Sequence, residues 1–486
     1  DAQFGEIDRA YAALVNGSLF FAGSDYQHGQ ELFHTTTVAP SVQEVRRLTD
    51  IFDGPDDSSA SEFTNFNGRT YFSARDVEGA ALWSTDGTPT GLRLVKRFDG
   101  ELDGPDDVLP HNLTIVNGTL FFVAGDKAHG VELWKSDGTP EHTVLVKDIE
   151  PEILDGFAFG SSPADLTSAH GLLFFTAEGP GNRQLWKSDG TEAGTVLVAD
   201  RDVRNLTEVN GRLMFAAPDD QSVSRPWVSD GTDAGTHIVT DSHPEGNSPS
   251  LPDDGATPWV SVNGTLVFVA DDGIHGMELW KSNGTTAGTV MVRDIGGSNT
   301  YSAPGELTAL NGKLLFVATD HNNVTRLWKS DGTAAGTIPL TTASAENAPN
   351  IRDVTTVGSV AYFVDGLGEL WKTNGTLAGT AHLASVPVDY YGAIHDLTAV
   401  GNSLYFVANI DELWKSDGTE AGTVLVESNF SSTGRYDDGA PQDPTAINGT
   451  CAGYLFNTNS LANLQTTNVK LAFSVFKLAG AVPQIS

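Results

Sequence analysis

Apolar residues in this chain gather in short runs that polar residues do not interrupt. Representative runs are TLFFVA (119–124), TLVFVA (265–270) and KLLFVA (313–318). A strand with one face in water alternates apolar and polar residues, whereas these runs place apolar side chains on both faces. The pattern therefore predicts strands in small sheets that are buried on both sides.

One unit of 41 to 53 residues recurs along the chain. Each copy reads as a strand, an Asn-Gly turn, a second strand, a loop, the segment ELWKS, a DGTxxGT turn and a last strand such as VLVKDI (144–149). Repetition at this length is typical of solenoids and propellers. The landmark of the unit is a tryptophan, which Phe33 replaces in the first copy: Trp83, Trp134, Trp186, Trp227, Trp280, Trp328, Trp371 and Trp414.

Two kinds of turn join the strands of a unit. Asn-Gly occurs at the first turn seven times, and both residues tolerate the positive φ of a two-residue type I′ turn. In the second turn, as in SDGTEAGT (188–195), the aspartate is placed to cap backbone amides, and we expect both glycines to supply left-handed positions. The unit is therefore predicted to be a four-stranded antiparallel sheet.

Four-stranded sheets of this size, covered on both faces by their neighbours, are the blades of a β-propeller. We expect an all-β chain of nine or ten blades in one large ring. The alternatives are two five-bladed rings, 1–245 and 246–486, and an open stack of repeats. The predicted units are 12–50, 62–98, 112–149, 166–200, 205–240, 259–295, 307–340, 353–384, 397–427 and a degenerate last unit, 443–480.

Composition excludes several classes of protein. Sixty-three acidic and 28 basic side chains give a net charge of −35, which repels phosphate backbones, so no nucleic-acid partner is expected. The single cysteine, Cys451, excludes an internal disulfide framework. No apolar run is long enough for a transmembrane helix, so we expect no membrane insertion. Asp1 lacks the start of an intact signal peptide, which is the pattern of a processed chain.

The most complete copy of the unit is VNGTLVFVADDGIHGMELWKSNGTTAGTVMVRDI, residues 262–295. This segment resembles the consensus of the ELWxxDGT-repeat family of secreted proteins, and the resemblance runs from Val15 to about Val426. It implies a propeller-like protein outside the cell or at its surface. The family offers no catalytic residues that could be carried over to this chain.

The repeated side chains are interpreted as scaffold. We expect each tryptophan to pack between blades with its indole N–H on a backbone partner; the alternative is an exposed ring that stacks on sugars. Asn283 and Asn374 replace the turn aspartate, and this exchange supports a turn role over a metal or catalytic one. Salt bridges to neighbouring acids are expected for the repeated lysines: Lys135, Lys187, Lys281, Lys329, Lys372 and Lys415.

Carboxylates are the candidates for metal binding. In three units an aspartate precedes a histidine by three residues: Asp25 and His28, Asp126 and His129, Asp272 and His275. Such a pair could bind a transition metal, but we expect a local bond from Asp to imidazole. No cofactor is required, and calcium is the one considered, because it needs six to eight oxygens on bent loops. The calcium candidates are Asp53, Asp56, Asp57, Asp103, Asp106, Asp107, Asp437 and Asp438.

Ten Asn-x-Ser/Thr sequons occur in the chain, and six of them are turns that the repeat already demands. The remaining four are interpreted as independent of the repeat. Their use depends on a eukaryotic secretory host. These glycosylation candidates are Asn112, Asn205, Asn323 and Asn429.

The sequence contains no nucleophile elbow, P-loop, HExxH motif or Rossmann fingerprint. We therefore expect a non-enzymatic structural or binding propeller, extracellular or on the cell surface, with a protein or glycan partner. Two alternatives stay open: a carbohydrate-binding or adhesion protein, and a propeller glycosidase or polysaccharide lyase. Residues that break the repeat are the better functional candidates: His111, Tyr390, Tyr391, His395, Tyr436 and the 240–258 connector.

Overall fold

The computed structural model of the chain describes most residues between Ala12 and Ser428. The described ranges are 12–15, 18–25, 29–39, 42–53, 56–88, 90–98, 108–151, 153–154, 157–179, 182–240, 250–251, 259–297, 302–341, 351–387, 394–400, 402–409 and 412–428. The predicted tenth unit, 443–480, lies outside them.

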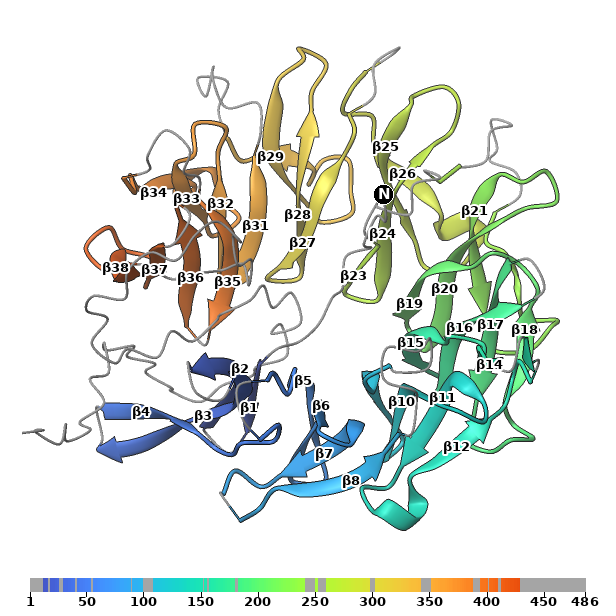
Figure 1. The fold of residues 1–486 in the computed structure, drawn as a ribbon. Helices are drawn as coiled ribbons and strands as arrows, with labels where there is room; N and C mark the ends of the chain where they lie inside the picture. The colour runs from blue at the N-terminus through green and yellow to red at the C-terminus, as the bar shows by residue number, and fades with distance from the viewer. Residues whose placement is uncertain are drawn as a thin grey trace, which may run out of the picture. The chain divides into compact units, whose positions relative to one another are not determined.

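Nine four-stranded antiparallel sheets lie within these ranges, each with its strands side by side in chain order (Figure 1). The first three sheets are β1 (Ala12–Val15), β2 (Ser18–Asp25), β3 (Gly29–Ala39) and β4 (Val42–Arg47); β5 (Ser61–Phe66), β6 (Arg69–Asp76), β7 (Gly79–Thr85) and β8 (Arg93–Arg97); β9 (His111–Val116), β10 (Thr119–Asp126), β11 (Gly130–Ser136) and β12 (Val144–Lys147). The next three are β15 (Ala164–Ala169), β16 (Leu172–Gly179), β17 (Asn182–Ser188) and β18 (Val196–Ala199); β19 (Arg204–Val209), β20 (Arg212–Pro218), β21 (Ser224–Ser229) and β22 (His237–Ile238); β23 (Val260–Val262), β24 (Thr265–Asp271), β25 (Met277–Ser282) and β26 (Val290–Arg293). The last three are β27 (Gly305–Leu310), β28 (Lys313–Thr319), β29 (Thr325–Ser330) and β30 (Ile338–Pro339); β31 (Arg352–Val357), β32 (Val360–Val364), β33 (Leu370–Thr373) and β34 (Ala381–Ala384); β35 (His395–Val400), β36 (Ser403–Ala408), β37 (Glu412–Ser416) and β38 (Val424–Ser428).

The prediction of an all-β chain of the β-propeller class, built from four-stranded repeats, is confirmed. A short extra hairpin, β13 (Ile153–Leu154) and β14 (Phe157–Ala158), follows the third sheet. Three second turns contain a single 3₁₀ turn: η1 (Pro140–His142), η2 (Thr286–Gly288) and η3 (Leu377–Gly379). No helix in the described ranges is long and apolar enough to cross a membrane. Closure into one ring stays a prediction.

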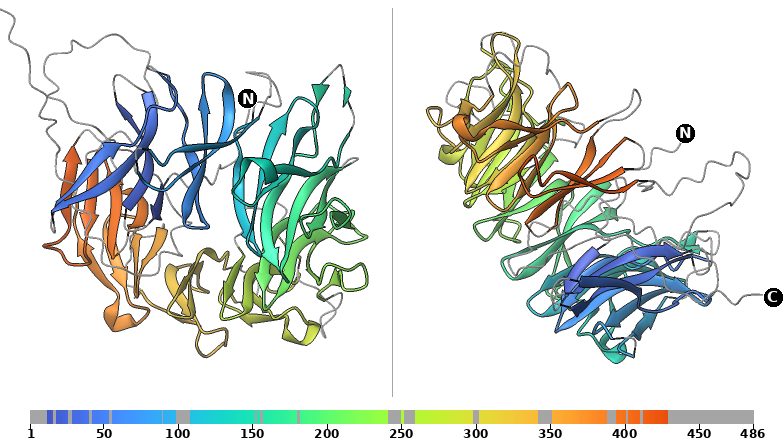
Figure 2. Two further views of the ribbon diagram at one scale, coloured as in Figure 1. Left: turned by 90° about the horizontal axis from the view of Figure 1, so that it is seen from below. Right: turned by 90° about the vertical axis from the view of Figure 1, so that its left-hand side faces the viewer.

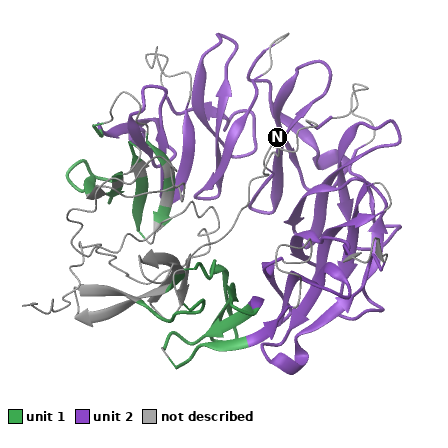
Figure 3. Ribbon diagram, viewed as in Figure 1, with its two compact units in different colours: residues 1–78, 82–94, 386–486 green, residues 79–81, 95–385 purple. Residues whose placement is uncertain are grey.

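The chain divides into two compact units (Figure 3). The first comprises residues 1–78, 82–94 and 386–486, and in it β1 contacts β5. The second comprises 79–81 and 95–385. Within the second unit the first strands of consecutive sheets contact one another in chain order, from β9 through β15, β19, β23 and β27 to β31. Figure 1 labels most of these strands, and Figure 2 draws the same ribbon from two other sides. The first strands therefore bring equivalent positions of successive blades together.

The hydrophobic core of the second unit lies between consecutive sheets. One cluster joins Met214 and Val228 of one blade to Phe268 and Trp280 of the next. The second strand supplies side chains to both faces, as Phe121 and Phe122 of β10 show with exposures of 2% and 0%. The predicted burial of these apolar runs on both faces is thereby confirmed, because alternate side chains of a strand point to opposite faces.

The first turn of each blade is the predicted two-residue hairpin. Asn117 and Gly118 have φ values of 49° and 76°, and Val116 pairs with Thr119. Positive φ at both central residues is the requirement of a type I′ turn. His170 replaces the asparagine in the next blade and keeps a positive φ of 53°. His170-Gly171 therefore retains the conformation, whereas at Gly358-Ser359, between β31 and β32, only the glycine has a positive φ.

The second turn combines an Asx cap with a close approach of backbone to carboxylate. Asp189 Oδ1 accepts hydrogen bonds from the Thr191 N–H at 2.8 Å and from the Thr191 hydroxyl at 2.7 Å. Gly190 has the expected positive φ, 87°, but Gly194 does not, so the prediction of two left-handed glycines is wrong. A Cβ on Gly194 would lie 2.1 Å from Asp189 Oδ1. A side chain at the second glycine would therefore collide with the capping carboxylate of Asp189.

Candidate functional site

The repeated tryptophans are buried or half-buried in the described blades. Trp134 and Trp328 donate their indole N–H to the backbone carbonyls of Ala124 and Ala318, at 3.0 and 3.1 Å. Trp371 donates instead to the carboxylate of Asp365 at 2.9 Å. The most buried of the set are Trp134, Trp227, Trp280 and Trp328; Trp83, Trp186, Trp371 and Trp414 are half-buried.

A cation from the preceding blade lies over several of these rings. Lys96 Nζ is 5.2 Å from the centre of the Trp134 ring. The indole face carries partial negative charge and attracts cations at such distances. This contact could not be predicted from the sequence pattern, because the basic residue ends one blade and the ring lies in the next. The other pairs are Lys147 with Trp186, Arg201 with Trp227 and Arg293 with Trp328.

The repeated lysines bind backbone carbonyls of the following blade. Lys135 Nζ donates to Gly190 O at 2.6 Å, and Lys329 Nζ donates to Gly375 O at 2.7 Å. Lys187 and Lys281 reach Gly231 and Gly332 in the same way. The prediction of salt bridges is wrong for these four lysines, because the positive φ of the turn glycine directs its carbonyl toward the previous blade. For Lys372 and Lys415 it stays a prediction. Each lysine–carbonyl bond fastens two consecutive blades.

Asparagines of the first turn form a second link of the same kind. Asn117 Nδ2 donates to Gly171 O at 2.6 Å, and Asn263 Nδ2 donates to Gly312 O at 2.7 Å. Each acceptor lies in the first turn of the following blade. The Asn-Gly turn thus shapes the hairpin and ties it to its neighbour. Asn210 bonds Gly264 O and Asn311 bonds Ser359 O likewise.

The glutamate of ELW is a buried carboxylate that fixes the connector to the next blade. Glu132 is fully buried, and its Oε1 accepts N–H bonds from Ile149, Glu150 and Ser161 at 3.0 to 3.1 Å. Its Oε2 accepts the Ser161 hydroxyl at 2.6 Å. Burial raises the pKa of the Glu132 carboxyl to about 7, although these hydrogen bonds oppose the rise. Glu31 and Glu278 hold equivalent positions.

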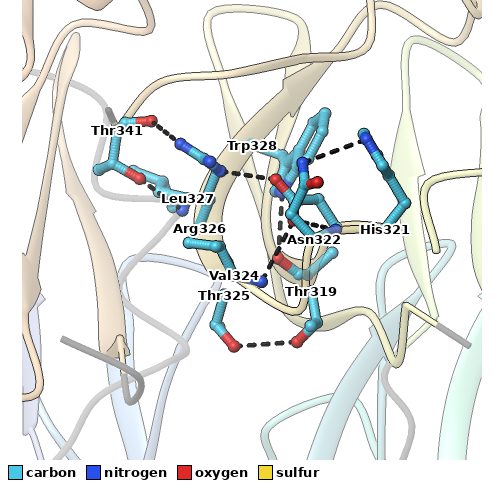
Figure 4. Close-up of polar contacts among 11 residues, drawn as sticks. Thr319, His321, Asn322, Val324, Thr325, Arg326, Leu327, Trp328 and Thr341 are labelled. Carbon is cyan, nitrogen blue, oxygen red and sulfur yellow. Dashed lines mark hydrogen bonds and ion pairs between the residues drawn. The ribbon is translucent and has the colours of Figure 1, made fainter. Parts of the chain in front are cut away.

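Where arginine replaces this glutamate, it pairs with the preceding loop instead (Figure 4). Arg326 Nε donates to Asp320 Oδ2 at 2.9 Å, and Arg326 Nη1 donates to Thr341 O at 3.3 Å. Asp320 Oδ1 accepts N–H bonds from Asn322 and Val324. Burial opposes ionisation of Asp320, but these bonds and the arginine outweigh it and hold the pKa below its usual range. The ion pair of Arg326 and Asp320 therefore fixes the conformation of the loop between β28 and β29.

The aspartate and histidine pairs are local, as predicted. His129 Nδ1 lies 2.9 Å from Asp126 Oδ1, and His275 Nδ1 lies 2.8 Å from Asp272 Oδ2. The same aspartates accept the backbone N–H of their histidine. The carboxylate is thus engaged inside its own loop. The pair Asp25 and His28 falls outside the residues whose side chains are described.

The first strand of most blades begins with a β-bulge whose residue is left-handed. Register shifts mark the bulges where the first strand pairs with the second. Left-handed φ is strained for residues other than glycine, and bulges concentrate near functional sites. In the second unit the φ values of these bulge residues run from 53° to 57°. We call this set of residues the bulge row: Asn112, Asp165, Asn205, Glu306 and Asp353.

The bulge row is polar and reachable from solvent. Asp165 and Glu306 are exposed, and the other three side chains are half-buried. Members of the row on contacting first strands lie side by side, from β9 to β19 and from β27 to β31, while β23 contributes none. Glu306 Oε2 accepts the Val354 N–H of the next blade at 3.2 Å. Sequence reasoning missed it, although a polar residue recurs two positions before threonine in HNLT, ADLT, RNLT, GELT and RDVT.

Two glycosylation candidates belong to this row. Asn112 and Asn205 occupy the position that Asp165 or Glu306 takes in other blades, so the interpretation that they are independent of the repeat is wrong. Asn323 is exposed in the loop between β28 and β29. Asn429 lies outside the described residues. Glycosylation itself stays a prediction.

Only three of the eight calcium candidates lie in the described ranges. Asp53, Asp56 and Asp57 are exposed, and within the described ranges no group of three or more His, Cys, Asp or Glu side chains converges to hold a metal ion. The remaining candidates lie outside these ranges: Asp103, Asp106, Asp107, Asp437 and Asp438. Calcium binding stays a prediction.

Among the residues that break the repeat, His111 and His395 begin first strands next to a bulge. His111 Nδ1 lies 2.9 Å from Leu109 O, which gives that histidine a local structural contact. Tyr390, Tyr391 and Tyr436 fall outside the described residues, as does most of the 240–258 connector.

Comparison with known proteins gives structural likenesses only: no family model and no curated protein matches the chain, and the ELWxxDGT resemblance stays a prediction. A puromycin-hydrolyzing peptidase from Mycobacterium tuberculosis is 10% identical, with 74% of this chain and 58% of that chain covered and a TM-score of 0.36. Prolyl oligopeptidase B from Galerina marginata is 12% identical, with 66% and 50% covered and a TM-score of 0.37. The computationally designed Ika8 protein is 12% identical, with 86% and 95% covered and a TM-score of 0.35.

Hydrolases and peptidases recur among these similar structures. This recurrence runs against the expectation of a non-enzymatic structural or binding module, which is not retained. At these identities and TM-scores it assigns no role to this chain, and the alternative of a propeller glycosidase or polysaccharide lyase stays a prediction. The chain spans 58% of the length of the puromycin hydrolase structures that it matches. The likeness does not make this chain itself an enzyme, and no catalytic motif is evident in its sequence.

Proposed function

We propose that this chain is the propeller part of an enzyme-linked protein, and that its bulge row contacts the substrate of a catalytic domain or subunit. The main observation in support of this proposal is the bulge row. It places a strained, polar residue at the same point of five of the six first strands in the second unit, β23 being the exception, and such strain is retained where the surrounding structure or a function requires it.

The other repeated side chains already make contacts that hold the blades together, which supports the choice of the bulge row as the surface that meets the substrate. Lys135 binds a neighbouring carbonyl, Asn117 binds another, and Trp134 is buried against Lys96 and Phe98 of the preceding blade. These groups build the scaffold and are not presented to a ligand.

Bulge-row carboxylates have partners too, since Asp165 accepts the Thr176 hydroxyl and Asp353 lies 3.5 Å from Arg352, but both side chains reach solvent. With three carboxylates and two amides, the row favours a polar or cationic substrate segment.

The experiment begins with the protein purified under mild conditions from the cells that make it. The purified species is assayed on peptide, ester and glycoside substrates. We expect hydrolytic activity that co-purifies with this chain. The variant Asp165→Asn/Asp353→Asn should raise KM at least threefold with kcat within twofold, because only substrate binding loses charge.

The matched control is Asp137→Asn, which changes an exposed carboxylate of a second turn without altering the bulge row. Its KM should equal that of the unmodified protein. A native species without hydrolytic activity, or equal KM values for the two variants, would overturn the proposal.

We also propose that the protein works outside the cell or at its surface. The net charge of −35 and the ELWxxDGT resemblance support this location. Antibody labelling of intact and of permeabilised cells tests it: labelling that requires permeabilisation would contradict the proposal.

A further inference from the structure

The fourth strand of each blade ends its sheet and leaves one edge that no strand of that sheet covers. Proteins discourage association at such edges with charged residues or proline. Six of the nine described fourth strands contain at least one of them: β4, β8, β12, β26, β30 and β38. Two others, β22 and β34, contain a histidine. The sequence of β18, Val-Leu-Val-Ala, contains none.

The apolar side chains of β18 reach the solvent. Val196 is 37% exposed and Leu197 is 44% exposed. Both lie in the regular part of the strand, where Val196 pairs with Lys187 and Leu197 with Trp186. The register shifts at the next residue, Val198, so the regular edge is short. Exposed apolar residues on an unprotected edge are typical of a site that accepts another extended chain.

Acidic side chains lie at both ends of β18. Glu192 precedes it in the second turn and Asp200 follows it directly, and both residues are exposed. Two cations also lie near these ends, and both have partners: Lys147 Nζ donates to Thr195 O at 3.0 Å, and Arg201 pairs with Asp220 at 3.1 Å. The edge is therefore apolar in its middle, and Glu192 and Asp200 are exposed acids at its ends.

We propose that the free edge of β18 binds an extended peptide with apolar residues in its centre and lysine or arginine at its ends. Charge complementarity selects this partner, whereas a second copy of this chain, with its net charge of −35, is repelled. The contact is a strand addition, in which main-chain groups give affinity and flanking charges give specificity. The proposal is independent of the bulge row and of any enzyme linked to the propeller.

The test uses the full chain and two fluorescent peptides, Lys-Val-Thr-Val-Thr-Val-Lys and Glu-Val-Thr-Val-Thr-Val-Glu, in fluorescence anisotropy titrations. We expect the lysine peptide to bind at least tenfold more tightly than the glutamate peptide. Its affinity should fall as salt rises, because the flanking charges are exposed and screened. Leu197→Lys should weaken binding at least tenfold, and Glu192→Lys at least threefold.

Matched controls come from the third sheet. Val144→Lys changes a valine that is 40% exposed on a strand already protected by Lys147, and Glu141→Lys changes an exposed acid of the corresponding turn. Both should leave the affinity within twofold. Circular dichroism and the melting midpoint verify that Leu197→Lys is folded. Equal binding of the two peptides, no binding of either, or full binding by folded Leu197→Lys would overturn the proposal.

Discussion

Lys135 in one blade donates a hydrogen bond of 2.6 Å to the carbonyl oxygen of Gly190 in the next. Gly190 is buried, so if the Lys135 ammonium were removed, the Gly190 carbonyl would lose a charged partner without gaining a water molecule in its place. A buried acceptor left without its partner costs about 1–3 kcal/mol. We therefore expect Lys135→Met to lower the free energy of unfolding by about that amount, measured by urea denaturation, whereas Lys135→Arg should lose less.

Lys313→Met is the control for this prediction, because Lys313 is an exposed lysine. Its effect should stay within about 0.5 kcal/mol, as for most surface substitutions. Equal effects of Lys135→Met and Lys313→Met would mean that the bond between the blades contributes nothing to stability.

The contact between Lys96 and the Trp134 ring predicts an energetic coupling between blades. Lys96 Nζ lies 5.2 Å from the ring centre, and such contacts contribute about 0.5–1 kcal/mol at partly exposed sites. A double-mutant cycle of Lys96→Met and Trp134→Leu should return a coupling energy of about this size, because leucine removes the aromatic face and the cycle cancels the separate cost of each substitution. Additive effects would contradict the cation–π contribution.

The four-stranded unit could be predicted from the sequence because its determinants are local. Asn117 and Gly118 demand a tight hairpin, and the adjacent Leu133 and Trp134 must face opposite sides of one strand. Both interpretations hold in the structure, where these two side chains are 0% and 5% exposed. Local φ preferences and strand geometry thus determine each blade before any neighbour is placed.

The contacts between blades could not be predicted in the same way, because they join residues about 50 positions apart. Lys135 was expected to meet a carboxylate, yet its partner is a carbonyl that the turn conformation of Gly190 exposes. The bulge row escaped notice because its residues change identity between blades: Asn112 and Glu306 share a backbone conformation without sharing chemistry. Pattern searches that require identical letters miss such positions.

The buried carboxyl of Glu132 predicts a pH dependence of stability. Burial raises its pKa to about 7 from an ordinary value of 4.5, so the folded state holds the proton more tightly than the unfolded chain. The associated stabilisation is complete below about pH 4.5 and is lost as the pH rises through 7. A shift of this size corresponds to on the order of 3–4 kcal/mol.

Glu132→Gln should remove this dependence, because glutamine is neutral at every pH. Relative to the variant, the unmodified protein should lose on the order of 2–3 kcal/mol of stability between pH 5 and pH 8, measured by urea denaturation across that range. Glu141→Gln, at an exposed carboxylate, serves as the control and should give a constant difference. A constant difference for Glu132→Gln as well would show that its hydrogen bonds keep the carboxylate charged throughout.

The Asx cap of the second turn predicts that asparagine can replace its aspartate. Asn283 Oδ1 accepts from the Thr285 N–H and hydroxyl at 3.1 and 2.7 Å, which matches the geometry at Asp189. Asp189→Asn should therefore change the unfolding free energy by no more than about 0.5 kcal/mol. Asp189→Ala, which removes both hydrogen bonds, should cost about 1 kcal/mol. Equal losses in the two variants would show that charge, rather than hydrogen bonding, fixes the turn.

The glycine that closes this turn predicts a steric penalty of its own. A Cβ at Gly194 would lie 2.1 Å from Asp189 Oδ1, so Gly194→Ala should cost about 1–3 kcal/mol through the displaced carboxylate. Gly305→Ala is the control, since a Cβ there meets nothing within 4 Å, and it should be neutral or slightly stabilising because alanine restricts the unfolded chain. The double variant Asp189→Ala/Gly194→Ala should cost less than the sum of its parts, because removing the carboxylate removes the clash. Additive losses in urea denaturation would instead locate the requirement for glycine in the backbone conformation, against the spatial explanation.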